Sequence, residues 1–127
     1  MDGAGWHILL VEDDPDIREL LAIILNLAGY RVTAMPDAER AWMHLQKSDD
    51  IDLVLTDYHL PGMPGDALIR QLLARSEHVP AVLMSAHPDI GIVASACGAD
   101  AVFCKVTSTI ELLEIIEVVL RRQNVMS

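Results

Sequence analysis

The stretch ILLVEDDP, residues 8–15, carries the pattern from which the fold is predicted. Its four consecutive aliphatic residues are typical of a short strand that is covered on both faces of a sheet. The acidic residues that follow end in Asp14 and Pro15, which are favoured as the N-cap and the first residue of a helix. A strand that leads directly into a helix is the repeating unit of parallel α/β folds.

The same alternation of strand and helix continues along the chain. Five strands are expected, the second weaker and of edge type, at residues 8–11, 30–34, 53–55, 81–84 and 101–104. The first helix ends at Gly29, and its apolar stripe is Ile17, Leu20, Leu21 and Ile24. Asp37 is the expected N-cap of the second helix, apolar residues at 68–73 mark the third, and the fourth is expected from Pro88 to Gly98.

The last helix is predicted to begin at a capping box formed by Ser108 and Glu111. It is expected to end near Arg122 and to leave a short polar tail at 123–127. Apolar residues lie around much of its girth and could form a face for a protein partner or a second buried side: Ile110, Leu113, Ile115 and Val118.

Right-handed crossovers between successive strands predict a doubly wound α/β fold, with a parallel sheet and helices on both faces. No linker, repeat or low-complexity tract divides the 127 residues, so we expect a single domain over 1–127 with its core at about 7–122.

The charge balance limits the classes of partner. The formal net charge of -10 makes direct binding of nucleic acid or of an anionic membrane surface unexpected. Cys97 and Cys104 have no metal-binding spacing, and no apolar stretch approaches the roughly 18 residues of a membrane span. We therefore expect a cytoplasmic protein without disulfides, zinc or a signal peptide.

Polar side chains are expected at the end of four of the predicted strands. Glu12 and Asp13 follow the first strand, Asp57 ends the third, Ser85 the fourth and Lys105 the fifth. The carboxyl ends of parallel strands form the ligand-binding edge of such a sheet. Two carboxylates about 4 Å apart repel by roughly 4 kcal/mol at an effective dielectric near 20. A counter-charge is therefore needed, and oxygen ligands of this kind favour Mg²⁺. Beside such an ion, a carboxylate can act as a nucleophile toward a phosphoryl group.

The segment DYHLPGMPG, residues 57–65, resembles the phosphoacceptor loop of the receiver domains of two-component response regulators, a family that includes the single-domain chemotaxis regulators. Residues 8–13, with the acidic pair Glu12 and Asp13, the pair Ser85-Ala86, and the approach to Lys105 are similar to the other motifs of that family. The resemblance covers the whole chain and implies a flavodoxin-like sheet with strand order 2-1-3-4-5.

The resemblance also implies the role of each site residue. Asp57 would be phosphorylated by a histidine kinase or a histidine phosphotransfer protein. Asp13, Asp57 and the backbone carbonyl of His59 would bind Mg²⁺, with Glu12 acting mainly through water. Lys105 and Ser85, with Ala86 as the small neighbour, would hold the phosphoryl oxygens.

Two positions depart from the pattern of the family. Val102 stands where the family has its switch aromatic, and Phe103, one place later, is expected to point to the opposite side of the sheet. Val106 stands where proline usually follows the lysine. Phosphorylation remains the favoured function, while the way in which the output surface switches is left open.

His59 and His87 lie two residues after Asp57 and Ser85, and we hypothesise that their imidazoles tune the rate of dephosphorylation. The alternative is that they are two ordinary loop histidines. His7, His44 and His78 are expected at the surface or at an edge.

Four other functions stay open. They are a phosphorylation-independent docking module, the receiver part of a hybrid histidine kinase, an aspartate-nucleophile phosphatase and a flavodoxin-like electron carrier. The phosphatase is disfavoured because His59 stands where its second acid is needed, and the electron carrier because no phosphate-binding loop follows the first strand. The downstream target and a homodimer are not decided by the sequence.

Overall fold

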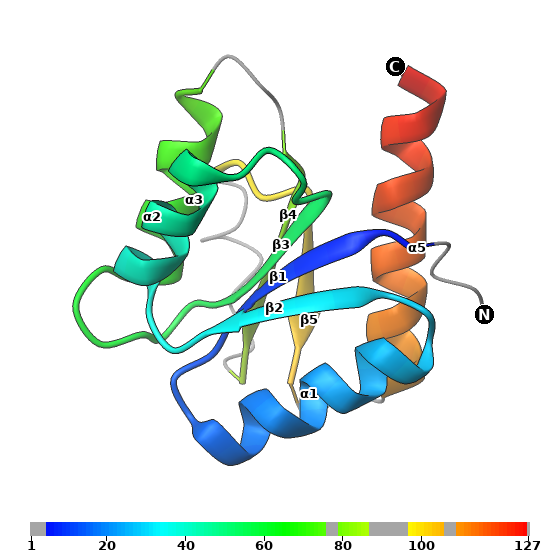
Figure 1. The fold of residues 1–127 in the computed structure, drawn as a ribbon, viewed down its shortest axis with the longest axis horizontal. Coiled ribbons are helices and arrows are strands. Elements are labelled where there is room, and N and C mark those ends of the chain that lie inside the picture. The colour runs from blue at the N-terminus through cyan, green and yellow to red at the C-terminus, as the bar shows by residue number, and fades with distance from the viewer. Residues whose placement is uncertain (1–4, 76–78, 87–96, 106–108, 127) are drawn as a thin grey trace.

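The computed structural model describes residues 5–75, 79–86, 97–105 and 109–126. Five parallel strands form one sheet in the order β2-β1-β3-β4-β5, which confirms the predicted order (Figure 1). The strands are β1 (His7–Val11), β2 (Arg31–Met35), β3 (Leu53–Asp57), β4 (Ala81–Ser85) and β5 (Ala101–Cys104).

Helices cover both faces of this sheet, as the crossovers require. The helices are α1 (Pro15–Leu27), α2 (Ala38–Lys47), α3 (Gly65–Leu73) and α5 (Thr109–Met126). Figure 1 shows α2 and α3 on one face and α1 and α5 on the other. Each face has its own buried cluster, because alternate residues of β1 point to opposite sides: Leu9 and Val11 toward α2 and α3, Ile8 and Leu10 toward α1 and α5.

The predicted helix boundaries are confirmed at the caps that the structure describes. The Asp14 side chain accepts hydrogen bonds from the backbone N–H groups of Asp16 and Ile17, and Asp37 accepts one from Arg40. Gly29 follows α1 with a φ of 98°, a conformation that favours glycine. The predicted fourth helix, except for the helical residue Cys97 and the turn at Gly98, and the capping residue Ser108 lie outside the described residues.

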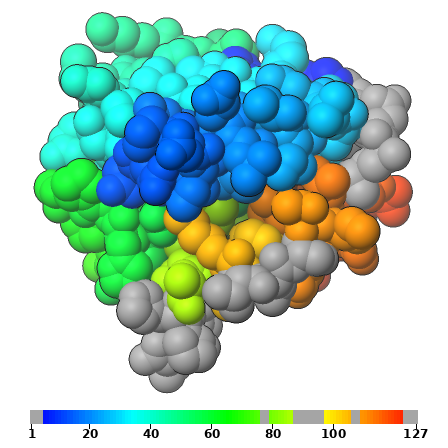
Figure 2. Space-filling model, turned by 90° about the horizontal axis from the view of Figure 1, so that it is seen from below, coloured from blue at the N-terminus to red at the C-terminus, as the bar shows by residue number. Residues whose placement is uncertain are grey.

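The buried face of α1 agrees only in part with its predicted apolar stripe. Leu21 and Leu25 are buried, whereas Ile17 is 37% and Leu20 56% exposed. Apolar residues occupy a wide arc of this helix, so their spacing alone does not say which part of the arc meets the sheet. Figure 2 shows the side of the molecule on which α1 (blue) lies, with the end of β5 (gold) and the first turns of α5 (orange) beside it.

The last helix is longer than predicted. α5 continues to Met126, four residues beyond the expected end at Arg122, so the prediction that the chain leaves the helix there is wrong over 123–126; residue 127 lies outside the described residues. Residues 123–126 include neither glycine nor proline, and nothing in that stretch stops a helix. None of the helices in the described part of the chain has the length and apolar character needed to cross a membrane.

His7, expected at the surface or at an edge, is buried as the first residue of β1, at the amino end of the sheet. Its ring nitrogens hydrogen-bond Asp50 at 3.2 Å and Thr33 Oγ1 at 2.7 Å, and its backbone N–H donates to Asp52 at 2.7 Å. A polar ring can be buried where both nitrogens find partners. These bonds tie β1 to β2 and to the loop before β3 at the amino end of the sheet.

Candidate functional site

The acidic pair after β1 is divided between the interior and the surface. Glu12 is 1% exposed, and its backbone N–H donates to the carbonyl of Met35 at 3.1 Å, which extends the pairing of β1 with β2 by one residue. Asp13 is exposed, and Asp14 is turned toward α1 as its cap. Asp14 therefore serves as the N-cap of α1, as predicted, whereas Glu12 and Asp13 contribute their side chains to the candidate site.

Asp57, the last residue of β3, is 6% exposed. The loop after it folds back at Gly65, whose N–H donates to the carbonyl of Tyr58 at 3.1 Å. A Cβ at Gly65 would lie only 2.1 Å from the carbonyl oxygen of Asp57, so glycine is required by this close approach. The start of α3 thus fixes the backbone of the proposed phosphoacceptor.

Carboxylate oxygens of Glu12, Asp13 and Asp57 all lie within 4.8 Å of one another. Three hard oxygen donors at one edge of a sheet suit Mg²⁺, which takes one or two carboxylates and retains water. The acidic cluster defined by these three residues therefore fits a magnesium site on its donor chemistry.

Lys105 supplies the positive charge of the site. Its Nζ donates to Asp57 Oδ2 at 3.0 Å and also to Glu12 Oε1. Burial lowers the pKa of the Lys105 ammonium, but the hydrogen bonds to Glu12 and Asp57 outweigh burial and raise it. Burial raises the pKa of Glu12, against the hydrogen bonds that it accepts from Lys105 and from the backbone of Asp14. Glu12 is thus bound directly to a lysine, a contact that the expected role through water does not include.

Ser85 and Ala86 lie beside this cluster. Ser85 is fully buried at the end of β4, which pairs with β3, and its carbonyl accepts from the backbone N–H of Lys105 at 2.9 Å. Ala86 follows and is exposed. The backbone N–H of His59 donates to Asp57 Oδ1 at 3.4 Å, and its exposed ring stands edge-on to that of Tyr58 with centroids 4.7 Å apart. His87 lies outside the described residues.

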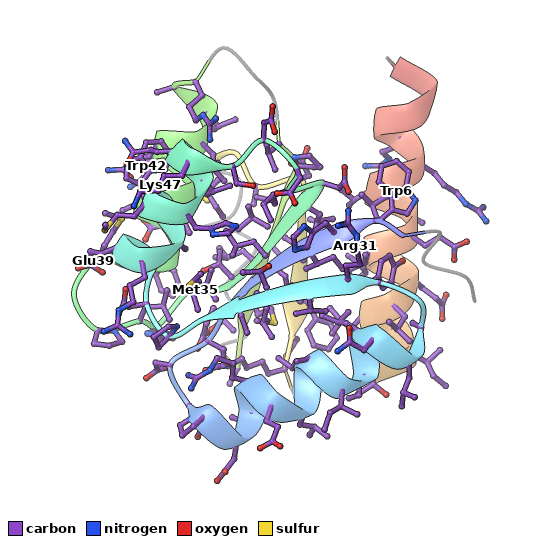
Figure 3. The ribbon with its side chains drawn as sticks, in the orientation of Figure 1. Trp6, Arg31, Met35, Glu39, Trp42 and Lys47 are labelled. Carbon is purple, nitrogen blue, oxygen red and sulfur yellow. The ribbon has the colours of Figure 1, made fainter. Side chains whose placement is uncertain are left out.

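The sequence interpretation missed one residue that supports the loop after Asp57. Glu39, labelled on α2 in Figure 3, accepts a hydrogen bond from the backbone N–H of Met63 at 3.4 Å. A Cβ at Gly62, which has a φ of 76°, would lie 2.6 Å from the Glu39 carboxylate. The two partners are 24 residues apart, so no local spacing could have indicated this contact.

The side chains of β5 alternate as predicted. Phe103 is 4% exposed and belongs to the cluster under α1 and α5, whereas Val102 packs against the opposite cluster. With Lys105, Phe103 lines a cavity of about 210 Å³ between α1 and α5. No aromatic side chain therefore occupies position 102, the position that the resemblance assigns to the switch residue.

A family model described as the response regulator receiver domain matches residues 8–117 of the chain. The chain belongs to this family. The receiver domain is 38% identical over 118 residues to the transcriptional regulatory protein CseB of Streptomyces coelicolor, and 36% identical over 117 residues to the sensory transduction protein RegX3 of Mycolicibacterium smegmatis. Each comparison covers 91% of this chain and 50% of the relative, so the receiver domain spans half the length of these proteins.

Solved receiver structures agree with the fold. The response regulator TrrA of Thermotoga maritima, solved in complex with Mg²⁺-BeF, superposes with a TM-score of 0.81 at 27% identity, over 90% of this chain and 98% of that one. A receiver domain of a signal transduction histidine kinase from Syntrophus aciditrophicus superposes with a TM-score of 0.84 at 28% identity, over 92% of this chain and 91% of that one.

The family defines the general chemistry of this site. Receiver domains of two-component response regulators are phosphoacceptors with autophosphatase activity, and they generally bind Mg²⁺ at an acidic pocket. They interact with histidine kinases or phosphotransfer proteins and are typically cytoplasmic. The acidic cluster of Glu12, Asp13 and Asp57 fits the phosphoacceptor and magnesium site of such a domain.

Proposed function

We propose that this chain accepts a phosphoryl group from a phosphohistidine onto Asp57, with Mg²⁺ as cofactor. The observation that carries this proposal is the position of Asp57, which is buried at the end of β3, within the acidic cluster and 3.0 Å from the ammonium of Lys105. A carboxylate held beside positive charge is able to act as nucleophile while the charge on the phosphoryl oxygens is neutralised.

In the proposed reaction, a carboxylate oxygen of Asp57 attacks the phosphorus of the donor. The P–N bond breaks with its electron pair left on the imidazole, and an acyl phosphate forms on Asp57. Water later attacks the same phosphorus, the P–O bond to Asp57 breaks, and phosphate leaves as the carboxylate is restored. The domain thus catalyses only its own modification and turns over no free substrate.

The other residues of the site have supporting roles in this proposal. Asp13, Asp57 and the carbonyl of His59 would bind Mg²⁺ directly, and Glu12 through water. Bound magnesium would neutralise charge at the phosphoryl oxygens. Lys105 would exchange its contact with the Asp57 carboxylate for one with a phosphoryl oxygen. The remaining contacts are assigned to Ser85, with its hydroxyl, and to Ala86, which leaves space beside it.

Incubation with acetyl phosphate and Mg²⁺, followed by intact-protein mass measurement, tests the proposal. We expect one hydroxylamine-labile phosphoryl group on the wild type and none on Asp57→Asn. Asp14→Asn is the matched control, because Asp14 is exposed and asparagine is an equally good helix cap. A wild type that takes up no phosphoryl group would identify instead a docking module that works without phosphorylation, which the absence of an aromatic residue at position 102 favours.

His59 and His87 are proposed to control access of water to the acyl phosphate. The exposed ring of His59 is two residues from Asp57. Replacement of both histidines by alanine is expected to change the rate of autodephosphorylation, measured as loss of the phosphoryl group after removal of acetyl phosphate. An unchanged rate would assign them as ordinary loop residues.

We propose that residues 1–127 act as one cytoplasmic receiver domain that contacts its output partner through α5. Leu113 and Ile115 pack against the cluster under α1 and α5, whereas Ile110 is 68% and Val118 47% exposed. The exposed pair supports contact with a protein partner or with a second copy of the chain. Size-exclusion chromatography with and without beryllofluoride tests whether that partner is a second copy.

A further inference from the structure

Arg18 turns back from the first turn of α1 toward the acidic cluster. Its Nη1 donates to the carbonyl oxygen of Glu12 at 2.9 Å and to that of Asp13 at 3.4 Å. Both acceptors are main-chain atoms of the residues whose side chains belong to the cluster. The guanidinium therefore acts on the backbone that presents the two carboxylates.

The segment between β1 and α1 is short and is held at its two ends by other bonds. Glu12 is joined to Met35 through its N–H, and Asp14 caps the helix while its own N–H donates to Glu12 Oε2 at 3.2 Å. Asp13 lies between them with an exposed side chain. The bonds from Arg18 join the carbonyls of Glu12 and Asp13 and so limit rotation of the Asp13 backbone, which sets the direction in which the Asp13 side chain leaves the main chain.

We propose that Arg18 is a positioning residue for the magnesium site, acting through the backbone of Glu12 and Asp13; this inference rests on the proposed function. Two effects of Arg18 have opposite signs. Its positive charge near the cluster opposes the binding of a cation, whereas its hydrogen bonds hold the ligands in place for one. If positioning dominates, removal of Arg18 weakens Mg²⁺ binding, and if charge dominates, removal strengthens it.

Isothermal titration calorimetry with MgCl₂ shows directly whether removal of Arg18 weakens or strengthens Mg²⁺ binding. For Arg18→Met we expect a Kd raised about tenfold, since loss of an outer contact to a metal ligand typically costs 10- to 100-fold in affinity. For Arg18→Lys we expect a smaller rise, because an ammonium keeps the charge and can still donate to a carbonyl, but its flexible stem does not hold the donor hydrogens in a fixed plane. The increase is expected to persist at high salt, which screens charge but leaves geometry unchanged.

Arg40→Met is the matched control, because Arg40 is an exposed arginine of α2 that contacts Asp37 and lies outside the site. It makes the same change in net charge, and its Mg²⁺ affinity is expected to equal that of the wild type. Circular dichroism verifies the fold of each variant, and if Arg18→Met does not fold, Arg18→Lys decides the question.

Wild-type or tighter Mg²⁺ binding in the folded Arg18 variants would overturn the inference alone. A wild type that binds no Mg²⁺ would overturn the proposed function together with it.

Discussion

Replacement of Gly65 by alanine tests how closely the start of α3 is packed against Asp57. Gly65 is the first residue of α3 and is not among the glycines with positive φ, so propensity alone predicts that alanine would stabilise the protein by about 0.5–1 kcal/mol. The lack of space for a Cβ at this position predicts instead that alanine destabilises the protein. The added Cβ would lie 2.1 Å from the carbonyl oxygen and 3.0 Å from the carbonyl carbon of Asp57, and both of these atoms are backbone.

The size of the effect follows from these distances. Ordinary contact requires the helix start and the end of β3 to separate by about 1 Å, and overpacking of this kind costs about 1–3 kcal/mol. The hydrogen bond from Gly65 to Tyr58 would be lost with it, at about 1 kcal/mol. Once the gain of about 0.5–1 kcal/mol from propensity is subtracted, we expect Gly65→Ala to lower the free energy of unfolding by about 1–3.5 kcal/mol. A displacement of this size at Asp57 is expected to slow phosphorylation by up to about 100-fold.

Urea denaturation measures the free energy of unfolding. The effect on phosphorylation is measured as the rate of reaction with acetyl phosphate, at a temperature where the variant is folded. Gly5→Ala serves as a comparison, since nothing lies within 4 Å of a Cβ at that position and only its φ of 78° opposes the change. A Gly65→Ala protein as stable as the wild type, with the same rate of phosphorylation, would refute the claim that this close approach fixes Asp57.

Three further predictions concern the site and the core. The pKa of Lys105 is raised above 10.5, so the folded state holds this proton more tightly than the unfolded chain. The resulting stability is present below pH 10.5 and is lost as the pH rises through the raised pKa. Urea titrations on either side of that pH should therefore show a loss of stability in the wild type that Lys105→Met lacks. Mg²⁺ at 100 times its Kd should stabilise the wild type by about 2.7 kcal/mol in thermal unfolding. Asp13→Asn should largely remove this stabilisation, whereas Asp49→Asn, an exposed and distant control, should retain it. Leu25→Ala should cost about 2–5 kcal/mol because Leu25 is fully buried, whereas Leu20→Ala should cost much less because Leu20 is 56% exposed; equal costs would contradict the assignment of the buried face of α1.

The sequence predicted the parts of the fold that depend on local signals. Asp14 and Asp37 cap their helices as expected, because capping involves residues two or three positions apart. The strand ends that carry Glu12, Asp57 and Lys105 come together because a parallel sheet places all its carboxyl ends on one edge.

The features that the sequence did not predict depend on contacts between distant segments. The buried side of α1 is decided by its packing on the sheet and not by its own periodicity. The burial of His7 depends on Asp50 and Thr33, which come from two other segments. Arg18 lies only a few residues from its acceptors, but main-chain carbonyls leave no signature in a sequence.

The two borders of the sheet are held by different kinds of contact. At the amino border, His7 joins neighbouring segments through contacts that include no atom of the phosphorylation site. At the carboxyl border, Lys105 joins the ends of β1, β3 and β5 through charged contacts with Glu12 and Asp57, which the proposed phosphorylation would alter. Phosphorylation of Asp57, as proposed, would therefore change contacts at the carboxyl border, whereas the hydrogen bonds of His7 at the amino border share no atom with it.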